Sequence, residues 1–93
     1  MKRYDWDGYK NVWLKEIRNI GFEDILIAIN NGNLLAILDH HKPDKYPGQK
    51  ILVVNIRDYA YLVPFVEDEE KRFLKTIYPS RKMTKKYLKE RRR

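Results

Sequence analysis

The apolar positions of residues 1–33 are spaced as in helices that each bury one face. Asp7 is suited to cap a first helix, and Gly21 is predicted to end it. The apolar positions on one side of that helix are Tyr9, Trp13, Leu14 and Ile17. A second helix is predicted over residues 22–31, with inward positions at Ile25, Leu26, Ala28 and Ile29. Residues 3–6 are compatible with a short additional strand.

From residue 34 the pattern changes to that of strands. Residues 34–38 are wholly apolar, which favours a buried strand or an extension of the preceding helix. A loop over residues 39–49 holds both histidines and two prolines. Strands are then predicted at 50–56, 59–66 and 71–78, joined by a tight turn at Arg57-Asp58 and an acidic turn at 67–70. Pro64 marks the second of these strands as an edge strand or the site of a bulge.

Ser80 is a plausible N-cap for a last helix from Arg81 to about Arg91, with an apolar stripe of Met83, Tyr87 and Leu88. The grouping of elements predicts one α+β domain over residues 1–93. It comprises two N-terminal helices, a small antiparallel sheet of three to four strands with an optional N-terminal strand, and a basic C-terminal helix at 80–93.

Charge is concentrated at one end of the chain. The sequence holds 20 Lys+Arg and 13 Asp+Glu, which gives a net charge of +7. Residues 1–80 are balanced, so the whole excess falls in residues 81–93. A solvated helix end would account for some of these cations. Their density nevertheless predicts that the partner is nucleic acid or another acidic molecule.

Several classes of protein are excluded by what the sequence lacks. There is no cysteine, so disulfides, thiolate metal sites and a cysteine nucleophile are excluded. No apolar run is long enough to cross a bilayer, and the first ten residues do not resemble a secretory signal. We therefore expect a cytoplasmic protein without a membrane partner. No Gly-rich phosphate loop or zinc-ligand spacing occurs, and no cofactor is predicted.

The junction between the last strand and the final helix is the main candidate for chemistry. Cleaving RNA without a metal requires a base for the 2′-OH, an acid for the leaving 5′-oxygen, and stabilisation of the charged phosphate. Clustered Lys, Arg and Tyr can supply all three, because neighbouring cations lower the pKa of a Lys or Tyr. On the last predicted strand Lys75 shares a face with Phe73 and Ile77, and Tyr78 lies on the other face. The helix adds Arg81, Lys82, Lys85, Lys86 and Lys89. Taken singly, each of these residues is also compatible with an ordinary solvent-facing or core position.

Two further patterns carry weaker signals. His40-His41, beside Asp39 and Asp44, could bind a metal or act as acid and base. Adjacent residues in an extended segment point in opposite directions and the remaining ligands are missing, so histidines without chemistry are the simpler interpretation and no metal site is predicted. A set of aromatic residues could stack unpaired bases or form the core of the sheet: Tyr59, Tyr61, Phe65, Phe73, Tyr78 and Tyr87.

Several short motifs are distributed over nearly the whole chain. The opening Y4-D-W-D-x-x-K10-N11-x-x-L14 and G21-F-E-D-I25 resemble the start of the BrnT-type toxins of bacterial type II toxin–antitoxin systems. The closing P79-S-R-K-M-T-K-K-Y87 is similar to their terminal S-x-R-K-A-T-type segment. The stretches K45-Y-P-G-Q-K-I51 and L62-V-P-F-V-E-D-E-E70 also look like a branch of this family.

The resemblance implies a fold like that of RelE-type ribonucleases. It also implies an endoribonuclease that cuts cellular RNA, such as free or ribosome-associated mRNA, and a cognate antitoxin that neutralises it. It favours Arg81, Lys82 and Tyr87 as catalytic, and the junction adds Lys75. The family more usually carries an Arg closer to the Ser, where this chain has Lys75 and Thr76.

The expected nucleic-acid-binding residues are Tyr78, Lys85, Lys86 and Lys89. We expect the antitoxin to cover the C-terminal helix with acidic and apolar residues. The alternative is a non-catalytic nucleic-acid-binding module or a partner-binding protein.

Overall fold

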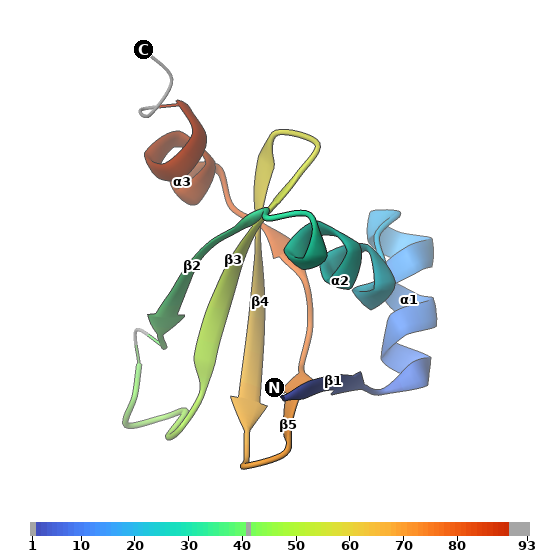
Figure 1. The fold of residues 1–93 in the computed structure, drawn as a ribbon, viewed down its shortest axis with the longest axis vertical. Helices are drawn as coiled ribbons and strands as arrows, with labels where there is room; N and C mark the ends of the chain where they lie inside the picture. Colours follow the sequence, from blue (N-terminus) through green and yellow to red (C-terminus); the bar gives the residue numbers. More distant parts are fainter. Residues whose placement is uncertain (1, 41, 90–93) are drawn as a thin grey trace.

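A computed structural model describes residues 2–40 and 42–89 and confirms the predicted α+β class. In chain order the elements are β1 (Arg3–Trp6), α1 (Gly8–Arg18), α2 (Phe22–Asn30), β2 (Leu34–Asp39), β3 (Lys50–Ile56), β4 (Tyr59–Glu67), β5 (Lys71–Leu74), β6 (Tyr78–Pro79) and α3 (Arg81–Thr84), which continues into a π-helical turn (Lys85–Lys89) (Figure 1). The predicted end of the last helix near Arg91 lies outside the described residues. Within the described ranges, no helix is long and apolar enough to span a membrane.

The sheet is larger than predicted and is mixed. Its strand order is β1-β5-β4-β3-β2, and β6 pairs with β4 further along the same edge. The optional N-terminal strand is present, but β1 runs parallel to β5, whereas the other pairings are antiparallel. β1 thereby occupies the outer edge of β5, which would otherwise present unpaired backbone groups.

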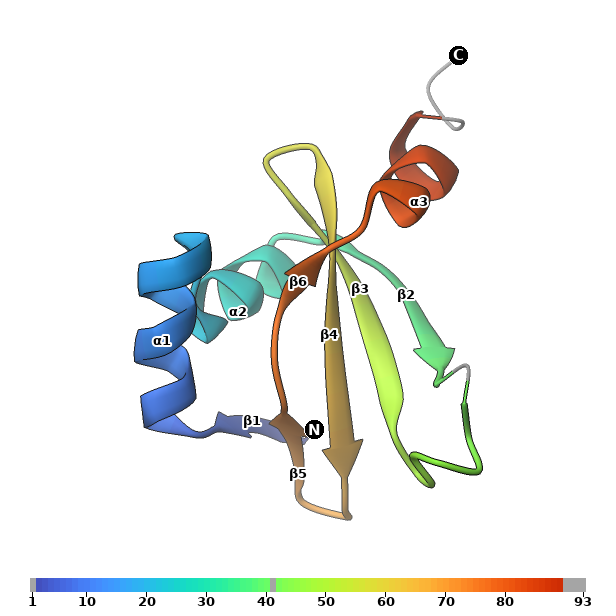
Figure 2. The same cartoon turned by 180° about the vertical axis from the view of Figure 1, so that it is seen from behind.

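The two faces of the central strands are covered by different helices. Alternate residues of β3 and β4 pack with α1 and α2 in one core that includes Leu14, Phe22, Ile25, Leu52, Val54, Val63 and Phe65. The opposite face of the same strands carries Ile51, Val53, Ala60, Leu62 and Pro64, and is named the α3 face here. Figures 1 and 2 show α1 and α2 on one side of the sheet and α3 on the other. The α3 face therefore lies next to the basic helix.

The ends of α1 are set by local side-chain chemistry. The predicted cap is confirmed, because Asp7 Oδ1 accepts a hydrogen bond from the Tyr9 N–H at 3.0 Å. The helix ends at Arg18, where the following residue Asn19 forms a left-handed C-cap with φ 57°, and not at Gly21 as predicted. Gly21 instead allows a close approach, since a Cβ there would lie 3.0 Å from Asn11 Oδ1, which is held in place by its hydrogen bond from the Phe22 N–H. The chain thus passes from α1 into α2 with little space between the two helices.

The predicted apolar side of α1 is divided between core and solvent. Leu14 is buried, whereas Tyr9, Trp13 and Ile17 are exposed. The second inward position is taken by Asn11, whose Oδ1 accepts from the Phe22 N–H at 2.7 Å and whose Nδ2 donates to the Glu23 carboxylate at 2.9 Å. The hydrogen bonds of the buried Asn11 side chain therefore join α1 to α2 at a place where the apolar spacing of the sequence predicted an apolar contact.

The predicted strand at 71–78 is wrong, because a bulge divides it into β5 and β6. Leu74 pairs with Phe65, and Tyr78 pairs with Leu62. Between these pairs β4 uses two residues and the opposing segment uses three, which is the one-residue excess of a β-bulge. The extra residue reverses the alternation, so Ile77 joins the same core as Leu74. Tyr78 accordingly pairs on the α3 face, where an uninterrupted strand would have placed Ile77.

Pro64 lies beside this bulge in the central strand β4. The edge-strand interpretation is thus wrong, and the bulge interpretation fits. The carbonyl oxygen of Pro64 accepts from the Lys75 N–H at 2.8 Å, so the proline nitrogen faces the same side. On that side β4 faces the bulge between β5 and β6, where its backbone pairing is interrupted. The missing N–H of Pro64 therefore removes no hydrogen bond to β3 on the other side.

Candidate nucleic-acid interface

The start of α3 is fixed to β4 by a small set of buried hydrogen bonds. Ser80 is the predicted N-cap, and its Oγ accepts from the Met83 N–H at 3.1 Å. Thr84 is buried, and its Oγ1 accepts from the Ala60 N–H and donates to the Ser80 carbonyl, both at 2.7 Å. The Ser80 N–H donates back to the Ala60 carbonyl at 2.9 Å. The basic helix is therefore held in a defined position on the sheet.

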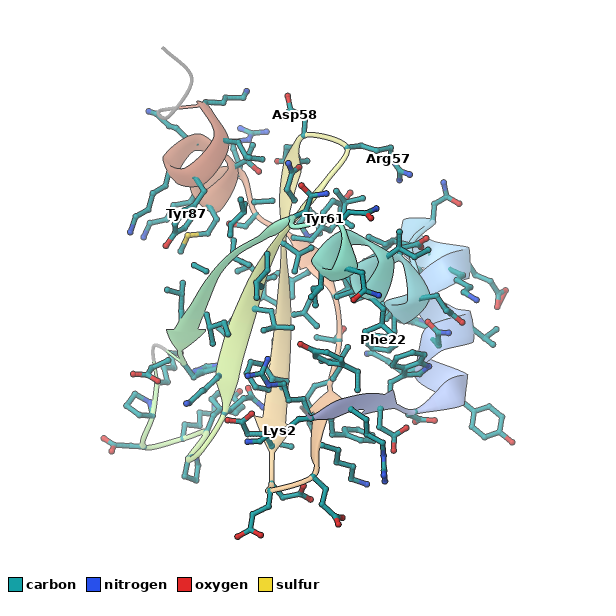
Figure 3. The ribbon with its side chains drawn as sticks, in the orientation of Figure 1. Lys2, Phe22, Arg57, Asp58, Tyr61 and Tyr87 are labelled. Atoms are coloured by element: carbon teal, nitrogen blue, oxygen red, sulfur yellow. The ribbon has the colours of Figure 1, made fainter. Side chains whose placement is uncertain are left out.

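The inward side of this helix matches the predicted apolar stripe. Leu88 is buried, and Met83 and Tyr87 are half-buried. Figure 3 shows Tyr87 projecting from the helix in the direction of β2. Thr84 belongs to the same side, and sequence reasoning missed it because a threonine in a helix gives no sign of a partner 24 residues away.

Five of the predicted cations project from this anchored segment into solvent. They are Arg81, Lys82, Lys85, Lys86 and Lys89, and all are exposed. None forms an ion pair with a residue in the ranges 2–40 and 42–89. Lys86 lies with its Nζ 5.4 Å from the centroid of the Tyr87 ring. The five cations are thus exposed and free of ion pairs with the described residues, which suits the binding of a polyanion.

The remaining predicted site residues, Tyr78 and Lys75, lie on the side of the α3 face, and the bulge is what places Tyr78 there. Tyr78 is half-buried and pairs with Leu62 of that face. Lys75 is exposed, its N–H is bonded to Pro64, and its Nζ lies 5.7 Å from the Phe73 ring centroid. Between Pro64 and Ala60, where α3 is anchored, β4 covers about 13 Å. Lys75 and the first turn of α3 therefore lie beside different ends of this stretch of β4, and both border the α3 face.

The aromatic residues considered as a stacking platform divide between the two faces. Phe65 is buried in the core with α1 and α2, and Tyr61 packs against that core. The rings of Tyr59 and Tyr61 contact each other at 6.0 Å. Three half-buried rings remain on the α3 side: Phe73, Tyr78 and Tyr87. Only this second group lies beside the cations and could stack against unpaired bases.

The histidine of the loop that the structure describes has a local role. His40 Nδ1 accepts from the Lys42 N–H at 3.1 Å, and its ring lies 4.4 Å from the ring of Tyr46. His41 lies outside the described residues. Among the residues that are described, no three His, Asp or Glu side chains gather in a metal-binding arrangement.

Sequence reasoning missed a charged cluster on the face covered by α1 and α2. Arg72 donates through Nε to Glu67 at 2.9 Å and through Nη1 to the Tyr4 hydroxyl at 3.1 Å. Lys2 Nζ lies 3.2 Å from the same carboxylate. Lys2, Tyr4 and Arg72, with Ile29, Asn30 and Glu69, line an open hollow of about 600 Å³. The predicted turn at 67–70 could have revealed this cluster. In an antiparallel hairpin around that turn, Glu67 and Arg72 lie opposite each other.

The Glu67 cluster predicts how stability changes in acid. The hydrogen bond from Arg72, followed by that from Lys2, lowers the pKa of Glu67 below its ordinary value. The Glu67 carboxylate therefore binds a proton less readily in the folded state than in the unfolded state. At pH values above its ordinary pKa, the ionised Glu67 stabilises the fold. This contribution is lost as the pH falls through the lowered pKa. We expect Glu67→Gln to reduce the loss of stability between about pH 7 and about pH 3, as measured by urea unfolding. An equal loss of stability in wild type and variant would contradict this assignment.

No family model matches the sequence, and no curated protein or solved structure matches it either. Function therefore has to be inferred from the residues and their arrangement. Anchored cations beside half-buried rings can bind phosphates, stack bases and move protons.

Proposed function

We propose that this protein is a metal-independent endoribonuclease of the toxin type that binds RNA across α3 and the α3 face. The observation that carries the proposal is a group of five exposed cations that form no ion pair with the described residues, on a helix fixed to the sheet through Thr84. A fixed array of cations can stabilise charge that develops on a phosphate without first having to reorganise.

In the proposed reaction the 2′-oxygen of the RNA attacks the adjacent phosphorus, and the bond to the 5′-oxygen breaks. The products are a 2′,3′-cyclic phosphate and a free 5′-hydroxyl. Arg81 and Lys82 hold the phosphate and stabilise its added negative charge. Tyr87 is assigned to proton transfer because it carries a hydroxyl group and is half-buried on the helix that carries the cations, with Lys86 Nζ 5.4 Å from its ring centroid. Lys85, Lys86, Lys89 and Tyr78 position the flanking strand.

Lys75 takes a modified role in this scheme. The spacing of about 13 Å along β4 exceeds the rise of about 3.4 Å per nucleotide in a stacked strand. Lys75 is therefore assigned to a nucleotide that flanks the scissile phosphate, or to the second proton transfer if the RNA bends across the face. The resemblance of several short motifs to those of BrnT-type toxins supports this function, and it extends the proposal to an antitoxin whose acidic and apolar residues cover α3.

A non-catalytic RNA-binding module is the second candidate. The observation that favours it is the separation of Lys75 from α3, since an acid and a base for one phosphate must both lie within hydrogen-bond reach of it. The two candidates share the same interface and differ in whether the phosphodiester bond is broken.

The test uses the purified full chain and a labelled single-stranded RNA at low salt, in the presence of EDTA. Cleavage with a 2′,3′-cyclic phosphate end, together with growth arrest when the chain is induced alone in bacteria, is the expected result. Salt-dependent binding without cleavage would select the binding module. Absence of both binding and cleavage would overturn the proposed interface.

A further inference from the structure

The hollow beside Arg72 lies between the end of α2, the strands β1 and β5, and the turn that joins β4 to β5. Its volume of about 600 Å³ is within the range of small-molecule sites. Figure 1 shows α3 at the opposite end of the molecule from β1 and this turn. The hollow is therefore separate from the proposed RNA interface.

Arg72 is held in one orientation at the wall of this hollow. Its Nε donates to Glu67 at 2.9 Å, and its Nη1 donates to the Tyr4 hydroxyl at 3.1 Å. The guanidinium carbon lies 5.3 Å from the centroid of the Phe65 ring and 5.9 Å from that of the Tyr4 ring. A ligand therefore meets a cation that is already positioned, and binding does not have to order a mobile side chain.

Part of the guanidinium is unused. It carries five N–H groups, of which the bonds to Glu67 and Tyr4 engage two. The other three, one on Nη1 and two on Nη2, have no partner within residues 2–40 and 42–89, and Nη2 is reached by solvent. Because Arg72 lines the hollow, the two oxygens of a carboxylate bound there can each accept one of these N–H groups.

The charges around Arg72 favour an anion. Lys2, Lys50 and Arg72 each have a nitrogen within 4.0 Å of the Glu67 carboxylate, so three cations share one anionic group. The Arg72 side chain is 24% exposed, so its charge is screened less than that of a fully exposed arginine. A negatively charged ligand is thus attracted to the side of the hollow formed by Arg72 and Lys2.

Glu69 restricts the charge that such a ligand can carry. It is the one acidic side chain among the described residues that lines the hollow, and it forms no ion pair with any of them. The neighbouring Asp68 is engaged by the N–H groups of Glu70 and Lys71, at 2.8 and 2.9 Å. A second negative charge on the ligand would be repelled by Glu69, so a carboxylate fits better than a doubly charged phosphate.

The rest of the wall suits an apolar body with a polar end. The Tyr4 hydroxyl accepts from Arg72, so its own proton is available to a ligand oxygen. Asn30 contributes a side-chain amide that can also donate. Ile29, which packs against the core, and the Tyr4 ring supply apolar surface. Lining of this kind, mostly apolar with a few placed polar groups, is typical of small-molecule sites.

We infer that this hollow is a binding site for a small organic carboxylate, with one negative charge and an apolar body, held by Arg72 and the Tyr4 hydroxyl. The inference is independent of the proposed function, because it involves no residue of α3 or of the α3 face. A bound carboxylate would connect the end of α2 to β1 and β5.

The first test titrates the full chain with 4-methylpentanoate at pH 8 and follows backbone amide signals by NMR. We expect saturable shifts at Tyr4, Ile29 and Arg72 with a Kd of about 1 mM. The uncharged 4-methylpentanamide, and 3-methylbutyl phosphate with about two negative charges, should each bind at least about tenfold more weakly. No saturation at about 50 mM, or equal binding of the amide, would overturn the site. Tighter binding of the phosphate would overturn its assignment to a carboxylate.

The second test changes the groups assigned to the ligand. Arg72→Lys keeps the charge but loses the planar group, and should weaken 4-methylpentanoate at least about tenfold. The matched control is Arg57→Lys in the turn between β3 and β4, outside the hollow, which should leave the affinity unchanged. Tyr4→Phe keeps the ring and removes one donor, and should weaken binding about three- to tenfold. Urea unfolding checks that each variant is folded, and Tyr4→Phe decides the outcome if Arg72→Lys is not.

The role of Glu69 has its own control in the same turn. Glu69→Gln should strengthen binding of 3-methylbutyl phosphate about threefold, because one repelling charge is removed. Glu70→Gln removes the same charge from a residue outside the lining and should change this affinity less than about 1.5-fold. Wild-type affinity for 4-methylpentanoate in both Arg72→Lys and Tyr4→Phe, or equal effects of the two glutamate variants, would contradict the proposed arrangement.

Discussion

Arg81→Ala is expected to slow RNA cleavage about 100- to 1000-fold, which corresponds to about 3–4 kcal/mol of lost transition-state stabilisation. Arg81 is exposed in the first turn of α3, and no ion pair with a described residue engages its guanidinium. The side chain is therefore available to a phosphate, and its removal should leave the fold intact. Single-turnover cleavage rates at saturating protein separate this effect from weaker binding.

The matched control for Arg81→Ala is Lys42→Ala. Lys42 is an exposed cation in the loop after β2, away from α3. Its removal changes the net charge by the same amount, and it should alter the rate only slightly through long-range attraction. Arg81→Lys keeps the charge and loses the two-pronged contact to phosphate, so an intermediate rate is expected. Equal rates for the Arg81→Ala and Lys42→Ala proteins would remove Arg81 from the catalytic assignment and leave only a general electrostatic effect.

Sequence reasoning succeeded where a local pattern determined the structure. The caps at Asp7 and Ser80, the tight turn at Arg57-Asp58 and the strand β3 follow from residue chemistry over a few positions, and the structure confirms them. Both residues of the turn adopt positive φ, which matches the twist that a two-residue hairpin requires.

It failed where a distant partner decided the outcome. The bulge after Leu74 reflects pairing with β4 across the sheet, and nothing in the residues of the 71–78 segment indicates that one of them would be unpaired. The consequence for the candidate site is direct, since the bulge decides which face Tyr78 occupies.

The exposed side of α1 is a similar case. Its apolar residues indicate burial, and nothing within the helix reveals that Asn11 would take the inward position through its bonds to Phe22 and Glu23.

The position of α3 also depends on a long-range contact, and Thr84→Val tests how far the interface relies on it. Valine keeps the branched shape of threonine but leaves the Ala60 N–H without a partner in a fully buried position. An unsatisfied buried donor costs about 1–3 kcal/mol. The Ser80 carbonyl still accepts from the Thr84 backbone N–H at 3.0 Å, so the loss arises mainly at Ala60. We expect about 2 kcal/mol lower stability in urea unfolding and faster hydrogen exchange at the Ala60 amide.

The same variant should separate the placement of the cations from their number. Thr84→Val removes no charge, so the salt dependence of RNA binding should keep the slope of wild type. Cleavage should nevertheless fall, because a loosened α3 no longer holds Arg81 and Tyr87 at fixed positions relative to the sheet. Thr84→Ser retains the hydroxyl and should keep most of the stability and activity. If Thr84→Val destabilised α3 while the cleavage rate stayed at the wild-type value, fixed placement would not be required, and the segment would act only as a flexible basic arm.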